Sequence, residues 1–391
     1  MSKIKDIEVF FLEYPFPKKL GYKYSGGLVE NMIVAIIKIT DSNDNYGIGE
    51  ITHGQFTHEP IIGLTKHFRD MLVGSDTNNI NQTWEKMYGS SVFWNREGIG
   101  IGVMGGINIA LYDLLGKNLK VPVYQLIGGL NKTKIRIYAS NGLFDNSAQL
   151  LEDAKKAYDA GFRIYKMRVI DPSYLIDLVD DFRKEFSNKM GLIVDAVQGS
   201  TSNPWATKVS INLAKELEKY KILFFEEPCR VENLEGYKEI KNSTDINIAG
   251  AESIPTARAF KPYFDANVFD VVQFDIATSG FTEGRRIADM AYVNNKPVAI
   301  HSWGSAISIM AGIHFSLSIS NSAFTEYCFM DHPINQDLFE DGKINIENGY
   351  IKKPKTYGLG VRFDEKIISQ YPYKEKINTM ISTVENDIKL V

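Results

Sequence analysis

The part of the chain after Gly129 repeats one pattern, and this repeat constrains the fold more than any other feature. Short apolar stretches rich in strand-forming residues alternate there with amphipathic segments that have helical spacing. The expected strands are 135–140, 162–169, 191–197, 222–228, 247–253, 271–277, 297–303 and 323–328. Eight strand–helix units in series predict a parallel sheet that closes into a TIM-like barrel.

The residues before Gly129 follow a different pattern. Segments 4–14 and 31–41 are rich in β-formers, and the second runs into an Asp/Ser/Asn turn. Segment 60–119 has apolar residues at helical spacing. With 391 residues the chain is too long for one ordinary core, so we expect a barrel with an accessory domain. No glycine-rich phosphate fingerprint follows the first barrel strand, which argues against a dinucleotide-binding fold.

The composition indicates a globular protein that handles a small molecule. The net charge is −4 and no basic run occurs, so we expect no nucleic-acid surface. The start of the chain lacks the apolar segment of a secretory signal, and we read no later stretch as apolar enough to span a bilayer. Cys229 and Cys328 make no disulfide framework. We therefore expect a cytoplasmic protein with two free thiols and no membrane partner.

Charged side chains stand at the carboxyl ends of the expected strands. From the second strand to the eighth they are Lys166 and Arg168, Asp195, Glu226 and Glu227, Glu252, Asp275, His301 and Glu326. Successive positions from Asp195 onward are separated by one strand–helix unit each. All of these groups should therefore meet at one mouth of the barrel, where barrel enzymes keep their active sites.

The acidic groups of three consecutive strands suggest a metal site. Asp195, Glu226 and Glu252 cannot all stay ionised close together without a cation, and carboxylates suit Mg²⁺. The alternative is that each carboxylate caps the next helix or pairs with a Lys or Arg. Strand neighbours point to opposite sides, so only one of Glu226 and Glu227 can face the barrel axis. The spacing alone leaves open which one does.

Two further pairs suggest acid–base chemistry. Asp275 and His301 end adjacent strands, and a carboxylate beside a histidine makes a general base. Alternatively, His301 is a hydrogen-bonded core residue. Lys166 and Arg168 lie two apart on one strand, where they could hold a carboxylate or a developing enolate, or else pair with the acidic cluster. We expect His314, within an apolar helical stretch, to be a packed core histidine.

These motifs together resemble the enolase superfamily, in its mandelate racemase / muconate lactonizing enzyme family and the mandelate racemase branch. The ordered set is Lys-x-Arg, Asp, Glu-Glu-Pro, Gly-x-Glu, Gln-x-Asp, His and Glu, with Leu-Ile-Gly-Gly before the barrel and Gly-Leu-Gly-Val at 358–361. The resemblance implies an α/β fold, a TIM-like (β/α)7β barrel with an α+β capping domain. The implied domains are a capping domain 1–125, a barrel 126–355 and a tail 356–391 that returns to the capping domain.

The resemblance also implies roles for the residues at the barrel mouth. Asp195, Glu226 and Glu252 match the Mg²⁺ ligands of the family. Asp275 and His301 match its catalytic dyad, and Glu326 matches the acid that hydrogen-bonds the enediolate oxygen. Lys166 matches the first residue of the Lys-x-Lys pair. The implied substrate is a small carboxylate with an α-proton, and we expect a homo-oligomer by analogy.

Three positions depart from the family pattern. Arg168 stands where racemases of this branch use a lysine base, and arginine is a poor base because it stays protonated. A two-base racemisation therefore loses one base, whereas a one-base elimination keeps the base that it needs. Val197 stands where the family often has Asn, for which Gln198 could substitute, and Phe281 stands where it often has Gly.

The function that these residues favour is an acid-sugar dehydratase, a hydro-lyase. It would remove the proton α to a carboxylate and eliminate the β-hydroxyl to give a 2-keto-3-deoxy acid. One alternative is a racemase or epimerase with Lys166 as its second base, and another is a non-catalytic, metal-dependent carboxylate-binding protein. Candidate residues for binding the substrate hydroxyls are Tyr22, Tyr24, Ser25, His53, Ser140 and Asn141.

Overall fold

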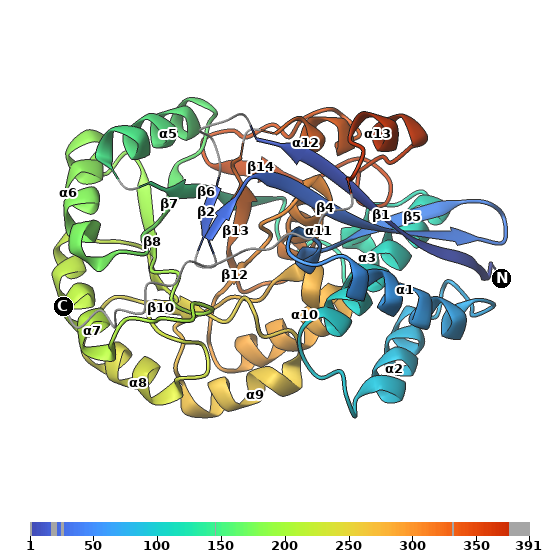
Figure 1. The fold of residues 1–391 in the computed structure, drawn as a ribbon, viewed down its shortest axis with the longest axis horizontal. Coiled ribbons are helices and arrows are strands. Elements are labelled where there is room, and N and C mark those ends of the chain that lie inside the picture. Colours follow the sequence, from blue (N-terminus) through green and yellow to red (C-terminus); the bar gives the residue numbers. More distant parts are fainter. Residues whose placement is uncertain (1, 17–21, 25–26, 145, 331, 375–391) are drawn as a thin grey trace.

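A computed structural model gives the fold of residues 2–16, 22–24, 27–144, 146–330 and 332–374. A barrel with an outer ring of helices forms one part of the molecule, and a smaller unit of strands and helices packs beside it (Figure 1). The strands and helices before residue 129 form the smaller unit, and the barrel strands begin with residue 134.

The barrel is built from eight parallel strands. They are β6 (Lys134–Leu143), β7 (Ile164–Arg168), β8 (Gly191–Asp195), β9 (Phe225–Glu226), β10 (Ile248–Gly250), β11 (Val271–Val272), β12 (Val298–Ile300) and β13 (Ser322–Cys328). The strands pair in chain order, and β13 pairs with β6 to close the barrel. The predicted barrel is confirmed, although several hydrogen-bonded strands are shorter than their apolar runs.

A helix follows each of the first seven strands, which gives the (β/α)7β order. These helices are α5 (Ser147–Asp159), α6 (Leu175–Phe186), α7 (Thr207–Leu217), α8 (Leu234–Asn242), α9 (Ala257–Ala266), α10 (Ile276–Val293) and α11 (Ala306–Ser318). Short 3₁₀ turns lie at η2 (Pro172–Tyr174) and η3 (Glu218–Tyr220). In α6, residues 175, 178, 179, 182 and 186 are buried, which is the i, i+3, i+4 stripe of a helix packed on a sheet.

The barrel interior is filled by side chains and is not a pore. One buried cluster takes a residue from each of six strands and from the position just before β9: Tyr138, Ile164, Ile193, Phe224, Ala249, Val271 and Ala299. Such a layer closes the barrel from below. The polar groups at the carboxyl ends of the strands therefore lie on a packed apolar floor.

The capping domain is an antiparallel sheet covered by helices. Its sheet has the order β1 (Ile4–Pro15), β4 (Asn31–Asp41), β5 (Tyr46–Ile51), and its helical segments are η1 (Thr52–Gln55), α1 (Glu59–Leu72), α2 (Ile80–Ser91) and α3 (Ile99–Leu119). A separate hairpin joins β2 (Tyr22–Tyr24) to β3 (Gly27–Val29), and β2 contacts barrel strand β6. A short helix, α4 (Val123–Leu126), then leads into the barrel.

Helix α3 corrects one expectation from the sequence. By length and composition alone it is apolar enough to cross a membrane, contrary to our reading that no such stretch exists. Most of its residues are buried, because it contacts β5 on one side and α10 of the barrel on the other. A helix enclosed by protein on several sides is apolar around its circumference. At Gly105 a Cβ atom would lie 2.2 Å from the carbonyl oxygen of Thr278, so glycine allows this close approach of α3 to the barrel.

The chain returns to the capping domain after the barrel. It forms α12 (Pro333–Leu338), β14 (Tyr350–Lys352), which pairs antiparallel with β6, and α13 (Glu365–Gln370). Pro372 then forms a bridge with Leu12 of β1, and the Tyr46 hydroxyl donates to the Phe363 carbonyl at 2.8 Å. The tail therefore ties the capping sheet to the barrel.

His314 of α11 is a buried core histidine that joins three segments. Its Nδ1 accepts the backbone N–H of Tyr124 in α4 at 3.2 Å, so its Nε2–H donates to the carbonyl of Leu359 at 3.2 Å. A proton on Nδ1 would face another donor, and burial in the first place lowers the pKa of His314 to about 4. The ring is therefore neutral in the folded protein.

We expect this histidine to make the fold sensitive to acid. Its folded-state pKa lies below the ordinary value of 6.5, so its contribution is complete above pH 6.5 and is lost as the pH falls towards 4. The loss should reach about 3 kcal/mol in the free energy of unfolding. Urea denaturation at pH 7 and pH 4.5 measures it, and His314→Gln should show a smaller difference between the two. An equal difference in both proteins would contradict the assignment.

Candidate active site

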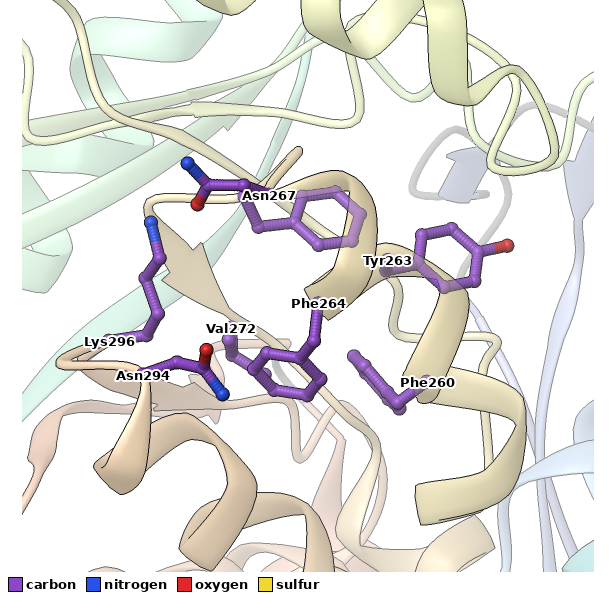
Figure 2. Close-up of a pocket in the computed structure, with 8 residues that line it drawn as sticks. Phe260, Tyr263, Phe264, Asn267, Val272, Asn294 and Lys296 are labelled. Atoms are coloured by element: carbon purple, nitrogen blue, oxygen red, sulfur yellow. The ribbon is translucent and has the colours of Figure 1, made fainter.

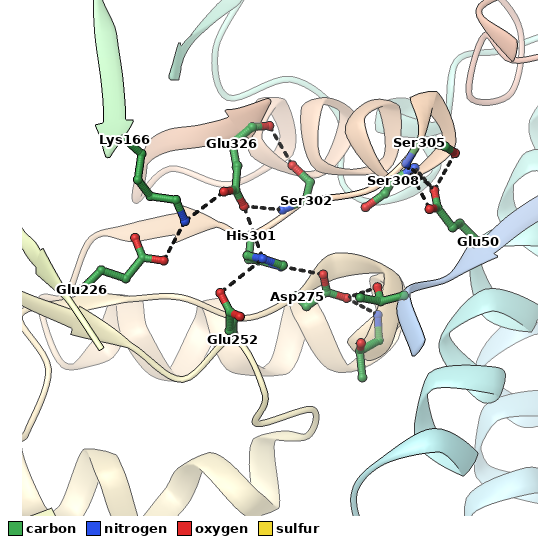
Figure 3. Close-up of polar contacts among 12 residues, drawn as sticks. Glu50, Lys166, Glu226, Glu252, Asp275, His301, Ser302, Ser305, Ser308 and Glu326 are labelled. Atoms are coloured by element: carbon green, nitrogen blue, oxygen red, sulfur yellow. Dashed lines mark hydrogen bonds and ion pairs between the residues drawn. The ribbon is translucent and has the colours of Figure 1, made fainter. Parts of the chain in front are cut away.

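The carboxyl ends of the barrel strands converge on Lys166 (Figure 3). The Lys166 ammonium on β7 lies 2.8 Å from Glu226 Oε1 and 2.9 Å from Glu326 Oε1, with Asp195 Oδ2 at 3.5 Å. The lysine side chain is only 2% exposed, so these contacts are shielded from water. Burial alone would lower the pKa of Lys166, but the carboxylates outweigh it and hold the pKa well above its usual value. Lys166 is therefore an ammonium ion.

His301 lies beside this network and contacts three carboxylates. Its Nδ1 is 2.7 Å from Asp275 Oδ2, while its Nε2 is 3.2 Å from Glu252 Oε2 and 3.5 Å from Glu326 Oε2. Burial lowers the pKa of His301, but Glu252, Glu326 and Asp275 together raise it to about 10. The predicted dyad thus forms, with Nδ1 turned to Asp275 and Nε2 turned to the acidic cluster.

Asp275 is held on both of its oxygens. While Oδ2 faces His301, Oδ1 accepts the backbone N–H of Thr278 at 2.6 Å and the hydroxyl of Thr52 at 2.8 Å. Asp275 therefore also caps the N-terminus of α10. Burial raises the pKa of Asp275, but the hydrogen bonds from His301, Thr278 and Thr52 lower it below its usual value. The carboxylate is thus ionised and fixed in orientation.

Glu326 is an ionised acceptor in this arrangement. Its Oε2 accepts the backbone N–H of Ser302 at 3.2 Å, and Lys166 contacts its Oε1. Burial raises the pKa of Glu326, but Lys166, His301 and the Ser140 hydroxyl lower it to about 2. The role of Glu326 as a donor to an enediolate, implied by the resemblance, stays a prediction, since the residue carries no proton here.

The mouth of the barrel has more acidic than basic groups. There are five carboxylates, on Asp195, Glu226, Glu252, Asp275 and Glu326, and three basic groups, on Lys166, Arg168 and His301. Burial is the main cause that raises the pKa of Glu226 to about 8 and raises that of Glu252, and acidic neighbours add to both shifts. These raised pKa values indicate that the barrel mouth contains too little positive charge to keep every carboxylate ionised.

The three predicted metal ligands fit a hard divalent cation by their chemistry. They supply only carboxylate oxygens, and Glu226 Oε2 is buried with no hydrogen-bond partner among the residues that the structure describes. Within residues 2–374, apart from the short gaps, no three His, Cys, Asp or Glu side chains are close enough to hold one ion. Instead, the Lys166 ammonium forms ion pairs with Asp195 and Glu226, and the His301 ring contacts Glu252. A cation would relieve the charge imbalance that these contacts only partly compensate.

Both parts of the chain match described families. Residues 6–128 match the mandelate racemase / muconate lactonizing enzyme N-terminal domain, and residues 149–367 match the enolase C-terminal domain-like family. The chain belongs to the mandelate racemase / muconate lactonizing enzyme family. The resemblance inferred from the residues at the strand ends is thereby confirmed, as is the barrel with its capping domain.

Relatives of this family member with named activities act on sugar acids. It is 27% identical to the arabinonate dehydratase of Saccharolobus solfataricus, over 89% of this chain and 93% of the relative. It is 32% identical to the D-galactonate dehydratase of Ralstonia pickettii, over 76% of this chain and 81% of the relative. The crystal structure of the 3,6-anhydro-D-galactonate cycloisomerase from Zobellia galactanivorans superposes with a TM-score of 0.83 at 29% identity, covering 94% and 99% of the two chains. The protein is thus an enzyme with acid-sugar dehydratase or a related enolase-superfamily activity.

Glu226, rather than Glu227, faces the centre of the site in this member of the family. The Glu227 carboxylate lies instead against the loop after β8, where a Cβ atom on Gly199 would be 2.0 Å from its Oε2. The choice that the sequence left open is made by the contact of Glu226 with Lys166.

Left-handed backbone conformations surround the three predicted metal ligands. Val197 (φ 55°), Glu227 (φ 43°) and Ala251 (φ 80°) each lie within two residues of one of them. Such conformations cost an L-residue about 1–2 kcal/mol and often mark functional sites. At Val197 the turn lets the backbone N–H donate to Asp195 Oδ1 at 2.8 Å. The strain is therefore located where the acidic side chains must be aimed.

Two of the three departures from the family pattern have structural explanations. Gln198 does not replace a substrate-contacting Asn at position 197. Its amide donates to the Ala196 carbonyl at 2.7 Å and accepts the Trp205 N–H at 2.8 Å, so it holds the loop after β8. Phe281 is buried and packs edge-on against the Tyr112 ring of α3, 5.2 Å between centroids. It therefore fills the contact between barrel and capping domain.

Arg168, the remaining departure, faces the mouth of the barrel beside Lys166. Its Nε donates to the Asn141 carbonyl at 2.9 Å, and its guanidinium lies 5.7 Å from the centre of the Trp303 ring. Both contacts orient a permanently charged group. Arg168 is thus placed to bind an anion and not to remove a proton.

The structure places the candidate substrate-binding residues in different surroundings. Ser140 of β6 has a buried hydroxyl with no hydrogen-bond partner among the described residues, and it lies near enough to Glu326 to help lower the pKa of that carboxyl. Asn141 contributes its carbonyl to Arg168, while its side chain donates to Asp153 of α5 at 3.1 Å. The His53 ring packs on α3, where a Cβ atom on Gly102 would lie 2.5 Å from its Nδ1. Tyr22 and Tyr24 belong to β2, and Ser25 lies outside the described residues.

Sequence reasoning missed several residues that support the site. Ser302 directly follows His301 and donates its backbone N–H to Glu326, and its position after a strand-end histidine was a usable signal. Tyr138 lies below Lys166, whose ammonium is 5.8 Å from the ring centre. Thr52 comes from the capping domain, 223 residues before Asp275, and no local pattern in the sequence points to it.

A cavity of about 330 Å³ lies elsewhere, between α9 and the segments that lead into β11 and β12 (Figure 2). Its walls carry the aromatic rings of Phe260, Tyr263 and Phe264, together with Lys296. None of the groups at the strand ends lines it. This cavity is therefore separate from the cluster of charged groups at the barrel mouth.

Proposed function

We propose that the protein is a Mg²⁺-dependent acid-sugar dehydratase. It would remove the proton α to the carboxylate of a polyhydroxy acid and expel the β-hydroxyl as water, giving a 2-keto-3-deoxy acid. The observation that carries the proposal is the presence of a single usable base at the mouth. His301 is held by Asp275, whereas Arg168 cannot lose its proton and Lys166 keeps Glu326 as an acidic partner even when Mg²⁺ takes Asp195 and Glu226.

Asp195, Glu226 and Glu252 would hold the Mg²⁺. When bound, it would neutralise the substrate carboxylate and make the α-proton easier to remove. With Glu252 engaged in this way, His301 would keep Asp275 and Glu326 as its acidic neighbours, and its pKa would fall from its high value towards the range of a general base. The same carboxylates would leave Lys166 freer to contact the substrate.

The remaining groups divide the work around the substrate. Lys166 and Arg168, two apart on β7, would bind the carboxylate and stabilise the negative charge that develops on its oxygens. His301 Nε2 would take the α-proton, while Asp275 keeps the proton on Nδ1. In a syn elimination the same imidazolium would return that proton to the departing hydroxyl, so that water leaves and no other reactant is consumed.

The alternative is an isomerase that uses the same enediolate. The likeness to a cycloisomerase at 29% identity favours this alternative. It requires a second proton donor or acceptor opposite His301. Lys166 could serve only if Glu326 released it as well, once Mg²⁺ had taken Asp195 and Glu226.

Proton NMR of a panel of sugar acids tests the proposal directly. The protein is incubated in D₂O with Mg²⁺ and each acid in turn, including pentonates and hexonates such as arabinonate and galactonate. We expect one or more acids to lose the α-proton signal and to gain 2-keto-3-deoxy signals. The matched controls are the same incubations with EDTA and with the corresponding uncharged sugars.

Two outcomes would contradict the proposal. Exchange of the α-proton for deuterium without loss of water would establish the isomerase alternative. Mg²⁺-dependent binding without exchange or turnover of any acid would indicate a binding protein.

A further inference from the structure

We infer that the capping domain positions the catalytic dyad, with Thr52 orienting Asp275 and Glu50 fixing the start of the helix behind His301. Both residues act through others, so they are positioning residues. The inference rests on the proposed function, since it treats His301 and Asp275 as the acid–base pair.

Thr52 makes the only capping-domain contact to the Asp275 carboxylate among the hydrogen bonds of the described residues. Its Oγ1 lies 2.8 Å from Oδ1, opposite the oxygen that faces His301. Without this hydroxyl, Oδ1 would keep only its contacts with Thr278, and the carboxylate would be less firmly held against a turn about its last torsion. His301 takes its orientation from the same carboxylate, so a turn of Asp275 would move the base.

Glu50 supports the His301 side of the dyad. Its carboxylate accepts the Ser305 N–H at 3.0 Å, the Ser305 hydroxyl at 2.7 Å and the Ser308 N–H at 3.0 Å (Figure 3). These donors form the N-terminus of α11, which begins only a few residues after His301. A buried anion at that position satisfies helix N–H groups that would otherwise lack partners. The loop that carries His301 is thereby tied to strand β5.

The two positioning residues lie close together in the chain, and the contact of Glu50 with the barrel is tightly packed. Glu50 and Thr52 are two residues apart, at the end of β5 and the start of η1. At Gly304 a Cβ atom would lie 2.7 Å from Glu50 Oε1, so glycine lets the carboxylate approach the loop after His301. One edge of the capping sheet therefore reaches both Asp275 and the segment that follows His301.

Substitution of Thr52 separates positioning from stability. Thr52→Val keeps the shape and removes the hydroxyl, and Thr52→Ser restores the hydroxyl. With an acid that the wild-type enzyme converts, Thr52→Val should lower kcat by roughly 10- to 100-fold at unchanged KM, because misplaced reacting groups cost rate. Thr52→Ser should regain most of the rate. Thr65→Val is the matched control, because Thr65 is a buried capping-domain threonine whose hydroxyl has no hydrogen-bond partner in the described part of the chain.

A second measurement needs no substrate. The proton between His301 Nδ1 and Asp275 should give a low-field NMR resonance, which His301→Asn removes and thereby assigns. Thr52→Val should shift or broaden this resonance, and Thr52→Ser should restore it. An enzyme that converts no acid but shows these changes would contradict the proposed function and leave the positioning role standing.

The inference also requires that the effect of Thr52→Val on the rate depends on Asp275. In an Asp275→Asn background, Thr52→Val should add little to the loss of rate, since the two changes remove one function. Full additivity, or a Thr52→Val enzyme with wild-type kcat and an unshifted resonance, would overturn the inference. A fall in melting temperature equal in Thr52→Val and Thr52→Ser, with rates following it, would also overturn it.

Discussion

His301→Asn should lower the rate of α-proton removal by about 1,000-fold, within the range that general bases contribute. Asparagine can keep a hydrogen bond to Asp275 but cannot accept a proton. Since Asp275, Lys166 and the predicted metal ligands are untouched, binding of Mg²⁺ and of the substrate should persist. The measurements are kcat for the acid found in the NMR panel and its rate of α-deuterium exchange in D₂O.

His67→Asn is the control for this variant, because His67 is exposed on α1, outside the barrel. It should behave as the wild-type enzyme. If His301→Asn stops exchange for one epimer of a substrate and leaves it intact for the other, a second base exists. Lys166 would then be the first candidate, and the isomerase alternative would replace the dehydratase.

Glu226→Gln should abolish the metal-dependent activity while leaving the protein folded. Removal of one carboxylate ligand should weaken Mg²⁺ binding by roughly 100-fold or more, since even groups outside the ligand shell contribute up to that factor. Burial raises the pKa of Glu226 to about 8, so the ionised side chain is unfavourable in the metal-free fold. The neutral amide should therefore not lower the melting temperature. Titration calorimetry with Mg²⁺ and thermal unfolding in EDTA measure the two quantities.

Glu227→Gln provides the matched comparison at the adjacent position. Its carboxylate lies against the loop that contains Gly199 and makes no ion pair with Lys166 in the described structure. We expect Mg²⁺ affinity close to that of the wild type. Equal losses in both variants would show that the two glutamates share the metal, and a loss confined to Glu227→Gln would reverse the assignment.

The arrangement of the barrel mouth could be predicted because it follows from chain order. Parallel strands in series bring their carboxyl ends to one face, so Asp195, Glu226, Asp275 and His301 were placed together from spacing alone. Their pairing could not be predicted in the same way. The choice of Glu226 over Glu227 depends on a left-handed turn at Glu227, and the capture of three carboxylates by Lys166 depends on side-chain reach.

The support from the capping domain lay beyond sequence reasoning for another reason. Thr52 meets Asp275 across 223 residues, and Ser305 meets Glu50 across 255. A threonine and a glutamate in a sheet edge are common and carry no periodic signal. Only the packing of α3 on α10, with a glycine at the crossing, brings that edge to the barrel.

Two parts of the capping domain contact the barrel in different places. Hairpin β2–β3 contacts barrel strand β6, whereas the β5 edge holds the loop after His301. Under the proposed function, the hairpin that carries the candidate substrate residues Tyr22 and Tyr24 could be exchanged without altering the contacts of Thr52 and Glu50. Exchange of the whole domain would also remove the contacts that Thr52 makes with Asp275 and that Glu50 makes with the loop after His301. New specificities in such a scaffold should thus arise by small replacements within this domain, and chimeras that import a foreign one should need residues 46–52 of the original.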